Sequence, residues 1–208
     1  MDVQQDDLTA RARIRDAAMA EFAERGLAGT TIRAVAERAG VSPALVQHHF
    51  GTKQRLREAC DAHVVDYLRR EAATGIDDGL IDDPGYIASI FRSAPPLLRY
   101  LARALVDGSP AAAGIFDDMV ALTESYLADV PGAADARTRA VVFTAMRLGL
   151  TVMHDHVSRG LGVDLFSREG STRVANATLD VVAPEIIPDG MADRVRTGLD
   201  RFGREEQP

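Results

Sequence analysis

The fold is decided by residues 30–50, which read TTIRAVAERAGVSPALVQHHF. Either of the threonines that open this stretch can cap a helix, and the apolar residues after them recur at helical spacing as far as Gly40. Ser42 is a second capping residue, and Pro43 presets the backbone angle of a first helical turn. The stretch therefore predicts two short helices joined by a tight turn, which is the pattern of a helix-turn-helix.

The charge distribution supports contact between this segment and DNA. In a helix-turn-helix the first helix crosses the DNA backbone and the second lies in the major groove. Residues 31–57 hold five basic side chains and one acidic side chain, although the 208-residue chain has a net charge of −7. Residues 1–74 are neutral as a whole, with 11 basic and 11 acidic side chains. This compact electropositive patch on an acidic protein predicts a double-stranded DNA operator as partner.

Helical periodicity continues on both sides of the motif and predicts an all-α fold. We expect an N-terminal three-helix DNA-binding domain at 8–68, with the helix-turn-helix at about 31–50 and a fourth helix that joins it to a larger helical domain at 76–205. The first helix is expected at 9–25, before Gly26, and the junction between the parts at 75–85. Further helices are expected at 84–92, 95–107, 110–129, 134–160, 170–182 and 190–204.

Composition excludes several classes of protein. The 46% hydrophobic content and the modest Pro and Gly counts argue against a disordered or collagen-like chain. Cys60 is the only cysteine, so neither an internal disulfide nor a cysteine-built zinc site can form, and its place on an apolar helical stripe predicts an inert core thiol. No apolar run approaches the roughly 20 residues of a membrane span. We expect a cytoplasmic protein without a membrane partner.

Residues 30–42, together with His48-His49-Phe50 and Lys53, closely resemble the N-terminal DNA-binding domain of the tetracycline-repressor (TetR) family. The resemblance covers residues 8–67 and rests on the order and spacing of several motifs, including a lysine three residues after the phenylalanine. It implies a homodimeric bacterial transcription regulator whose C-terminal helical domain binds a small effector and dimerises. The family commonly has a tyrosine at the position of Gln47, so the phosphate contact of that tyrosine does not carry over.

The candidate DNA contacts follow from the motif and from side-chain chemistry. Lys53 is expected at the start of a helix, where its positive charge is unfavourable beside the positive end of the helix dipole. A DNA phosphate bound there would be attracted by both the lysine and the helix N-terminus. The Gln47 amide can donate a hydrogen bond to a phosphate or pair with the edge of an adenine. The small side chains of Pro43 and Ala44 can lie against thymine methyl groups. His48 is expected on a base or a phosphate and His49 on a phosphate. The full set is Thr31, Arg33, Ser42, Pro43, Ala44, Gln47, His48, His49 and Lys53.

The expected helix at 134–160 is apolar on more than one side. It needs two partners, of which one is its own domain and the other the matching helix of a second subunit. The apolar face formed by Val174, Ala177, Thr178, Val181 and Val182 would enlarge this interface. A two-fold homodimer is therefore expected.

Arg147, Thr151 and His154 recur at helical spacing on the same expected helix, so they share a face. They either bind a ligand or pair with surface carboxylates, because inward polar groups are costly unless paired. Aromatic and other side chains nearby are candidates to line a cavity for an unknown, mostly apolar or aromatic small molecule. The candidate effector set is Tyr100, Arg103, Phe116, Met119, Thr123, Phe143, Arg147, Thr151 and His154.

The function expected from these observations is a ligand-responsive transcriptional regulator, namely a repressor released by its effector. One alternative is a DNA-binding regulator without a small-molecule effector, and another is an all-α enzyme. No paired carboxylates with a histidine partner, no Cys-His set and no cofactor motif stand out, so we expect neither catalysis nor a cofactor. Adjacent helical residues point about 100° apart, so His48 and His49 predict no metal site.

Overall fold

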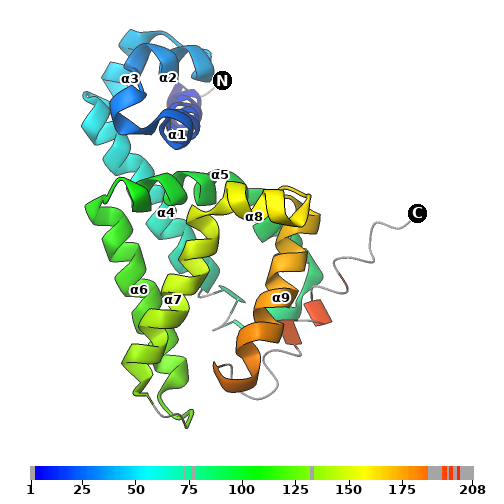
Figure 1. Ribbon diagram of the computed structural model, residues 1–208. Helices are drawn as coiled ribbons and strands as arrows, with labels where there is room; N and C mark the ends of the chain where they lie inside the picture. The colour runs from blue at the N-terminus through cyan, green and yellow to red at the C-terminus, as the bar shows by residue number, and fades with distance from the viewer. Residues whose placement is uncertain are drawn as a thin grey trace. The chain divides into compact units, whose positions relative to one another are not determined.

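The computed structural model describes residues 3–72, 74–75, 78–131, 134–186, 194–195, 197–198 and 201. These residues form helices and connecting turns without a strand, which confirms the all-α fold (Figure 1). They divide into two units, one of residues 1–67 and 96–113 and the other of residues 68–95 and 114–208. Each unit is described by itself.

The first unit contains the helix-turn-helix, whose two helices begin and end close to where the sequence predicts, whereas the first helix starts six residues before the expected Thr9. Helix α1 (Val3–Gly29) is followed by α2 (Ile32–Ala39), α3 (Pro43–Phe50) and the start of α4 (Lys53–Ala72). The α2–α3 turn forms because Gly40 adopts a left-handed conformation, with φ 66° and ψ 39°. The core of the motif is apolar and consists of Ile14, Ala18, Phe22, Val35, Val46, Phe50 and Leu56.

Gly26 interrupts α1, as its expected role at the end of that helix implies. Its φ of 68° and ψ of 173° belong to a region that only glycine adopts readily, and the chain resumes a short helical turn before Thr30. A Cβ added at Gly26 would lie 2.5 Å from Nη2 of Arg103, which is in the same unit. The Arg103 guanidinium is the flexible end of a side chain and can move aside, so it is the backbone conformation that requires glycine here.

Gly26→Ala should lower the free energy of unfolding by about 1–3 kcal/mol, because alanine is strained at this φ and ψ. Gly114→Ala is the matched control, since a Cβ there meets no atom within 4 Å. Gly114 lies inside the helix at 110–127, so this control should stabilise the protein by about 0.5–1 kcal/mol. Urea unfolding of both variants measures the difference, and equal midpoints would show that the kink at Gly26 is dispensable.

Helix α5 (Pro84–Val106) corrects the prediction of two helices at 84–92 and 95–107. Pro95 and Pro96 suggested a break, because proline lacks an N–H donor. The buried side chains nevertheless continue across them at helical spacing: Ile87, Ala94, Leu97, Leu101 and Ala104. Burial of this continuous face outweighs the lost backbone hydrogen bonds.

Helix α6 (Pro110–Leu127) begins at Ser109, whose Oγ accepts a hydrogen bond from Ala112 N at 3.0 Å. Helix α7 (Ala136–Val152) lies beside α6 in the second unit (Figure 1). Val120, Leu127 and Ala140 form the buried contact between these two helices.

The prediction of a single helix at 134–160 is wrong. Helix α7 ends at Val152, and a separate helix, α8 (His154–Leu161), begins after Met153. Met153 has a φ of −90° and a ψ of 21°, outside the α-helical region, although its N–H still reaches Gly149 O at 2.9 Å. Gly149 and β-branched Val152 both weaken the last turn of α7, which allows the change of direction.

Helix α9 (Arg168–Ile186) is longer at both ends than the expected 170–182. Its start is capped by Ser167, whose Oγ accepts a hydrogen bond from Gly170 N at 3.1 Å. Leu179 of α9 packs against Ile87 of α5 in the core of the second unit. Most of the expected helix at 190–204, and the side chain of Val182, lie outside the described residues. None of the described helices is both long enough and apolar enough to cross a bilayer.

Candidate nucleic-acid interface

Both helices of the motif begin with the capping residues that the sequence predicts. Thr31 Oγ1 accepts a hydrogen bond from Ala34 N at 3.1 Å, and Ser42 Oγ accepts one from Leu45 N at 3.2 Å. Pro43 occupies the first turn of α3. These local bonds position α3 independently of any ligand.

One face of α3 is buried and the opposite face is open. Val46 and Phe50 are buried, whereas Pro43, Ala44, Gln47 and His48 are exposed. The exposed face thus carries two small side chains, an amide and an imidazole, which are suited to contact base edges. Thr31, Ser42 and Arg33 are exposed as well, while His49 is half-buried beside the ring of Phe50.

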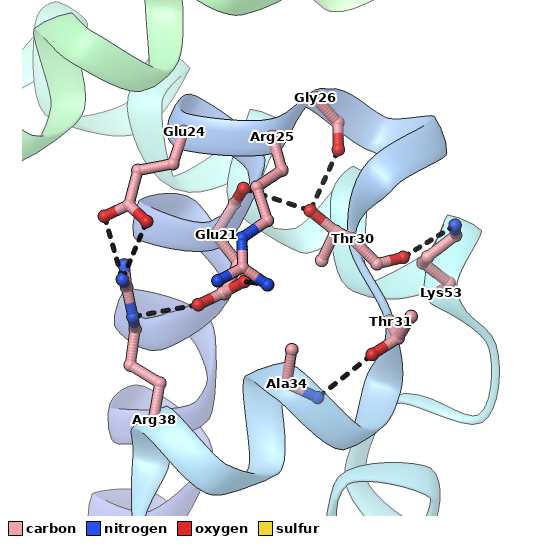
Figure 2. A network of polar contacts seen from close by, with 9 residues as sticks. All are labelled: Glu21, Glu24, Arg25, Gly26, Thr30, Thr31, Ala34, Arg38 and Lys53. Carbon is pink, nitrogen blue, oxygen red and sulfur yellow. Dashed lines mark hydrogen bonds and ion pairs between the residues drawn. The ribbon is translucent and has the colours of Figure 1, made fainter.

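Lys53 has protein partners in this structure. Its ammonium donates hydrogen bonds to Leu27 O at 2.8 Å and to Thr30 O at 2.9 Å, and the side chain is half-buried. Figure 2 shows the contact with Thr30. The phosphate contact expected for Lys53 stays a prediction, with one ammonium proton not used by these two carbonyls.

Two further cations near the motif are bound by the protein itself. Nη2 of Arg13 donates to Ala39 O at 2.6 Å, at the end of α2. Nε of Arg38 lies 3.0 Å from the carboxylate of Glu21, and its Nη2 lies 2.8 Å from that of Glu24 (Figure 2). Only 4% of the Glu21 side chain is exposed, so Arg38 holds a buried carboxylate between α1 and α2. Arg13 and Arg38 therefore stabilise the motif.

Arg33 and Arg55 differ from these cations. Both side chains are exposed, and within the described part of the chain neither guanidinium has a hydrogen bond or ion pair. Arg33 was among the expected DNA contacts, but Arg55 was not. The signal for Arg55 was its place in the electropositive patch at residues 31–57.

Two of the candidate effector residues, Tyr100 and Arg103, lie in the first unit. The hydroxyl of Tyr100 donates to Asp61 Oδ1 at 2.5 Å, and Arg103 pairs with Asp107 at 3.0 Å. Both line a small hollow of about 10 Å³, whose other walls include Phe22 and Arg57. A hollow of this size has room for about one water molecule and is far too small for a drug-sized ligand.

Asp61 and Cys60 adjoin the same part of the first unit. Burial raises the pKa of the Asp61 carboxyl, an effect that the hydrogen bond from Tyr100 and the charge of Arg57 oppose. Burial also raises the pKa of the Cys60 thiol far above its ordinary value. Its fully buried side chain confirms the expected core position and keeps the thiol protonated at neutral pH.

The other candidate effector residues lie in the second unit, on three helices. Phe116, Met119 and Thr123 are half-buried on α6, and Phe143 and Thr151 are half-buried on α7. The expectation that all three of Arg147, Thr151 and His154 share one helix face is wrong for His154, whereas Arg147 does lie one turn before Thr151 on α7. The Arg147 side chain is exposed, with its guanidinium 5.9 Å from the ring centroid of Phe143. His154 belongs to α8, where its ring lies 5.2 Å from that of Phe166.

Within the described residues, His, Cys, Asp and Glu side chains form no group of three that could hold a metal ion. The first unit presents an exposed helix face with exposed arginines near it, in a motif whose α1 and α2 are joined by Arg38 on the buried Glu21 carboxylate.

Two family profiles match the chain. The profile "Bacterial regulatory proteins, tetR family" matches residues 14–60, and "Tetracyclin repressor-like, C-terminal domain" matches residues 93–187. The first match spans the helix-turn-helix, and the second spans the later part of α5 and the helices α6 to α9. Together they account for more than half of the chain.

Curated relatives share shorter stretches. The HTH-type transcriptional regulatory protein RaaS of Mycobacterium tuberculosis is 42% identical over 123 residues, which are 58% of this chain and 57% of that protein. The HTH-type transcriptional regulator BetI of Burkholderia mallei is 44% identical over 68 residues, 30% of this chain and 35% of that protein. The chain thus covers less than two thirds of either relative's length.

Solved structures share the fold over nearly the whole chain. The TetR family protein CprB from Streptomyces coelicolor has a TM-score of 0.70 at 21% identity, covering 96% of this chain and 99% of CprB. A structure of CprB in complex with its biological operator sequence has a TM-score of 0.65 at 20% identity, covering 94% of this chain and 97% of that CprB chain. NalD, the secondary repressor of the MexAB-OprM multidrug efflux pump in Pseudomonas aeruginosa, has a TM-score of 0.59 at 19% identity. This match covers 88% of this chain and 99% of NalD.

Proposed function

Because the chain belongs to the tetracycline-repressor (TetR) family, we propose that it is a homodimeric transcriptional repressor that leaves its operator when a small molecule binds. The observation that carries this proposal is the exposed face of α3, with Ala44, Gln47 and His48 held open by a buried opposite face. The protein acts by binding and not by catalysis. Contact with the chromosome requires that it work in the cytoplasm.

The proposed division of labour follows the exposure of each side chain. Pro43, Ala44, Gln47 and His48 read base edges in the major groove. The exposed side chains of Thr31, Arg33, Ser42 and the additional Arg55 contact DNA phosphates. The half-buried His49 also contacts a phosphate. Residues 8–68 form the DNA-binding domain in this proposal, and residues 76–205 the effector-binding and dimerisation domain.

Dimerisation is proposed through an apolar stripe on α7. Val142 is 53% exposed and Met146 is 49% exposed one turn later, although both are apolar. Gly149 continues the stripe, and a Cβ there would meet no atom within 4 Å, so a second helix has room to approach. On α9, Ala177 is exposed and Val181 is 74% exposed at the same four-residue spacing. These two stripes, repeated by a two-fold axis, suit an isologous interface.

The effector proposal centres on the half-buried side chains of α6 and α7: Phe116, Met119, Thr123, Phe143 and Thr151. They are mostly apolar and suit an apolar or aromatic compound. NalD is named as a repressor of an efflux pump, and another neighbour at TM-score 0.66 is named as a gamma-butyrolactone receptor. For the effector to release the protein from DNA, it must bind the DNA-incompetent state more tightly than the DNA-bound state. The coupling free energy between an effector site and a second binding site is typically about 1–3 kcal/mol.

Selection of genomic fragments by the purified protein tests the proposed function. We expect enrichment of a pseudo-palindromic sequence whose half-sites lie about one helical turn apart, ~34–36 Å, or a multiple of it. A variant with Ala44, Gln47 and His48 replaced by glutamate is the control and should enrich nothing. Failure of the parent protein to enrich any fragment, while folded and at low salt, would contradict the proposal.

A further inference from the structure

The end of α1 leaves backbone carbonyls that need partners. The chain leaves the helical conformation at Gly26, resumes a short helical turn and then reaches Thr31, the N-cap of α2. Carbonyls at a helix end have no partner within the helix. Thr30 is buried, and its hydroxyl can donate a hydrogen bond to Glu21 O at 3.0 Å or to Gly26 O at 2.9 Å. It thereby joins this segment to the end of α1.

Lys53 binds the same segment from the start of α4. Its ammonium reaches Leu27 O and Thr30 O across 26 and 23 residues of sequence. A cation is favourable beside the carbonyls of a helix end and unfavourable in the first turn of a helix. The two carbonyls therefore offset the conflict between Lys53 and the dipole of α4 without any DNA phosphate.

This contact links three elements of the DNA-binding motif. Thr30, whose carbonyl accepts a hydrogen bond from Lys53, directly precedes the residue that caps α2 (Figure 2). Helix α2 in turn is held to α1 by Arg38 on the buried Glu21. A change at the α1–α2 junction therefore moves the cap of α2 and, through the short turn at Gly40, the start of α3.

We propose that Lys53 is a positioning residue for DNA binding, which ties the start of α4 to the α1–α2 junction and so fixes where α3 is presented. The phosphate contacts beside it come from Arg55, in the same first turn of α4, and from Arg33. Both arginines are exposed, and neither has a bonded partner among the described residues. This inference rests on the proposed DNA-binding function for its effect on affinity, but the tie itself does not.

Chemical labelling of amines tests the contact between Lys53 and the α1–α2 junction in the absence of DNA. Lys53 is the only lysine in the sequence, so acetylation followed by mass spectrometry reports on it alone, with the α-amino group as internal reference. The ammonium must leave two carbonyls before it reacts, so labelling in the folded protein should be slower than in urea by about tenfold or more. Added duplex should change the rate little. Equal rates in folded and unfolded protein, with strong protection by duplex, would overturn the proposal.

The salt dependence of DNA binding tests the role. Lys53→Gln should leave the slope of log K against log salt on a non-specific duplex unchanged, whereas Arg55→Gln should lower it by about 0.9. At a temperature where both variants are fully folded, Lys53→Gln should also lower the ratio of operator to non-specific affinity by about tenfold. A merely stabilising residue would leave that ratio unchanged.

The outcomes separate this inference from the proposed function. A loss of about one unit of slope in Lys53→Gln overturns the positioning role whatever the labelling rate. An unchanged operator ratio in the folded variant overturns it as well. Slow labelling in a protein that binds no DNA would confirm the tie and contradict the proposed function alone.

Discussion

Replacing Val142 by glutamate should leave the protein monomeric and remove its preference for operator DNA. Val142 lies on the exposed apolar stripe of α7, and a two-fold interface would bury both copies of the new carboxylate. Burial of an unpaired polar group costs about 2 kcal/mol or more, so two copies should weaken the dimer by about 4 kcal/mol, or roughly a thousandfold. A single protomer reaches only one half-site, and its specific affinity falls accordingly.

Val106→Glu is the matched control for this experiment. Val106 is also an exposed apolar residue, at 64%, but it ends α5 in the first unit and lies outside the proposed interface. Sedimentation at micromolar concentration should show a dimer for the control and a monomer for Val142→Glu. A dimer in both variants would place the interface elsewhere.

Arg38→Met should lower the free energy of unfolding by about 3–5 kcal/mol, because it leaves the buried Glu21 carboxylate without its main partner. Nε of Arg38 lies 3.0 Å from that carboxylate, of which only 4% is exposed. The other cation at Glu21 is Arg25, at 3.3 Å, whose own side chain is 54% exposed. Arg25 is too solvated to compensate fully.

Two further variants isolate the cause of this effect. Arg25→Met, which removes the exposed partner of the same carboxylate, should cost no more than about 1 kcal/mol. Combining Arg38→Met with Glu21→Gln removes the buried charge and should recover part of the loss. Urea denaturation at neutral pH measures all of them. If Arg38→Met costs no more than Arg25→Met, then the buried ion pair does not stabilise the motif.

The helix-turn-helix could be predicted almost to the residue because its signals are local. Thr31, Ser42 and Pro43 act within one turn of their own positions, and Gly40 is required by its own backbone angles. The exposed and buried faces of α3 follow from the spacing of Val46 and Phe50. None of these features depends on a distant part of the chain.

Helices in the second half were predicted less well because tertiary packing decides them. Pro95 and Pro96 favour a break, yet the continuous buried face of α5 keeps one helix. The opposite error occurred after Val152, where no proline marks the end of α7 and the start of α8. His154 consequently lies on a different helix from Arg147 and Thr151, so the face expected for the three residues does not form.

The internal roles of charged residues were the hardest to foresee. Lys53 binds carbonyls more than 20 residues away, and backbone carbonyls carry no signal in the sequence. Glu21 did leave a signal, since it lies seven residues after buried Ile14 on the apolar stripe of α1. An acidic residue on such a stripe predicts a buried ion pair, and Arg38 provides it.

The central claim is that the exposed face of α3 reads bases, and the base preference of Gln47→Ala tests it most directly. Gln47 is exposed on α3, while its neighbour Val46 is fully buried, so the substitution changes the reading face without disturbing the core. Selected fragments should differ from those of the parent at the same position in each half-site, with discrimination there changed by about 1–3 kcal/mol. Identical selected sequences for parent and variant, at every position of the operator, would contradict the account.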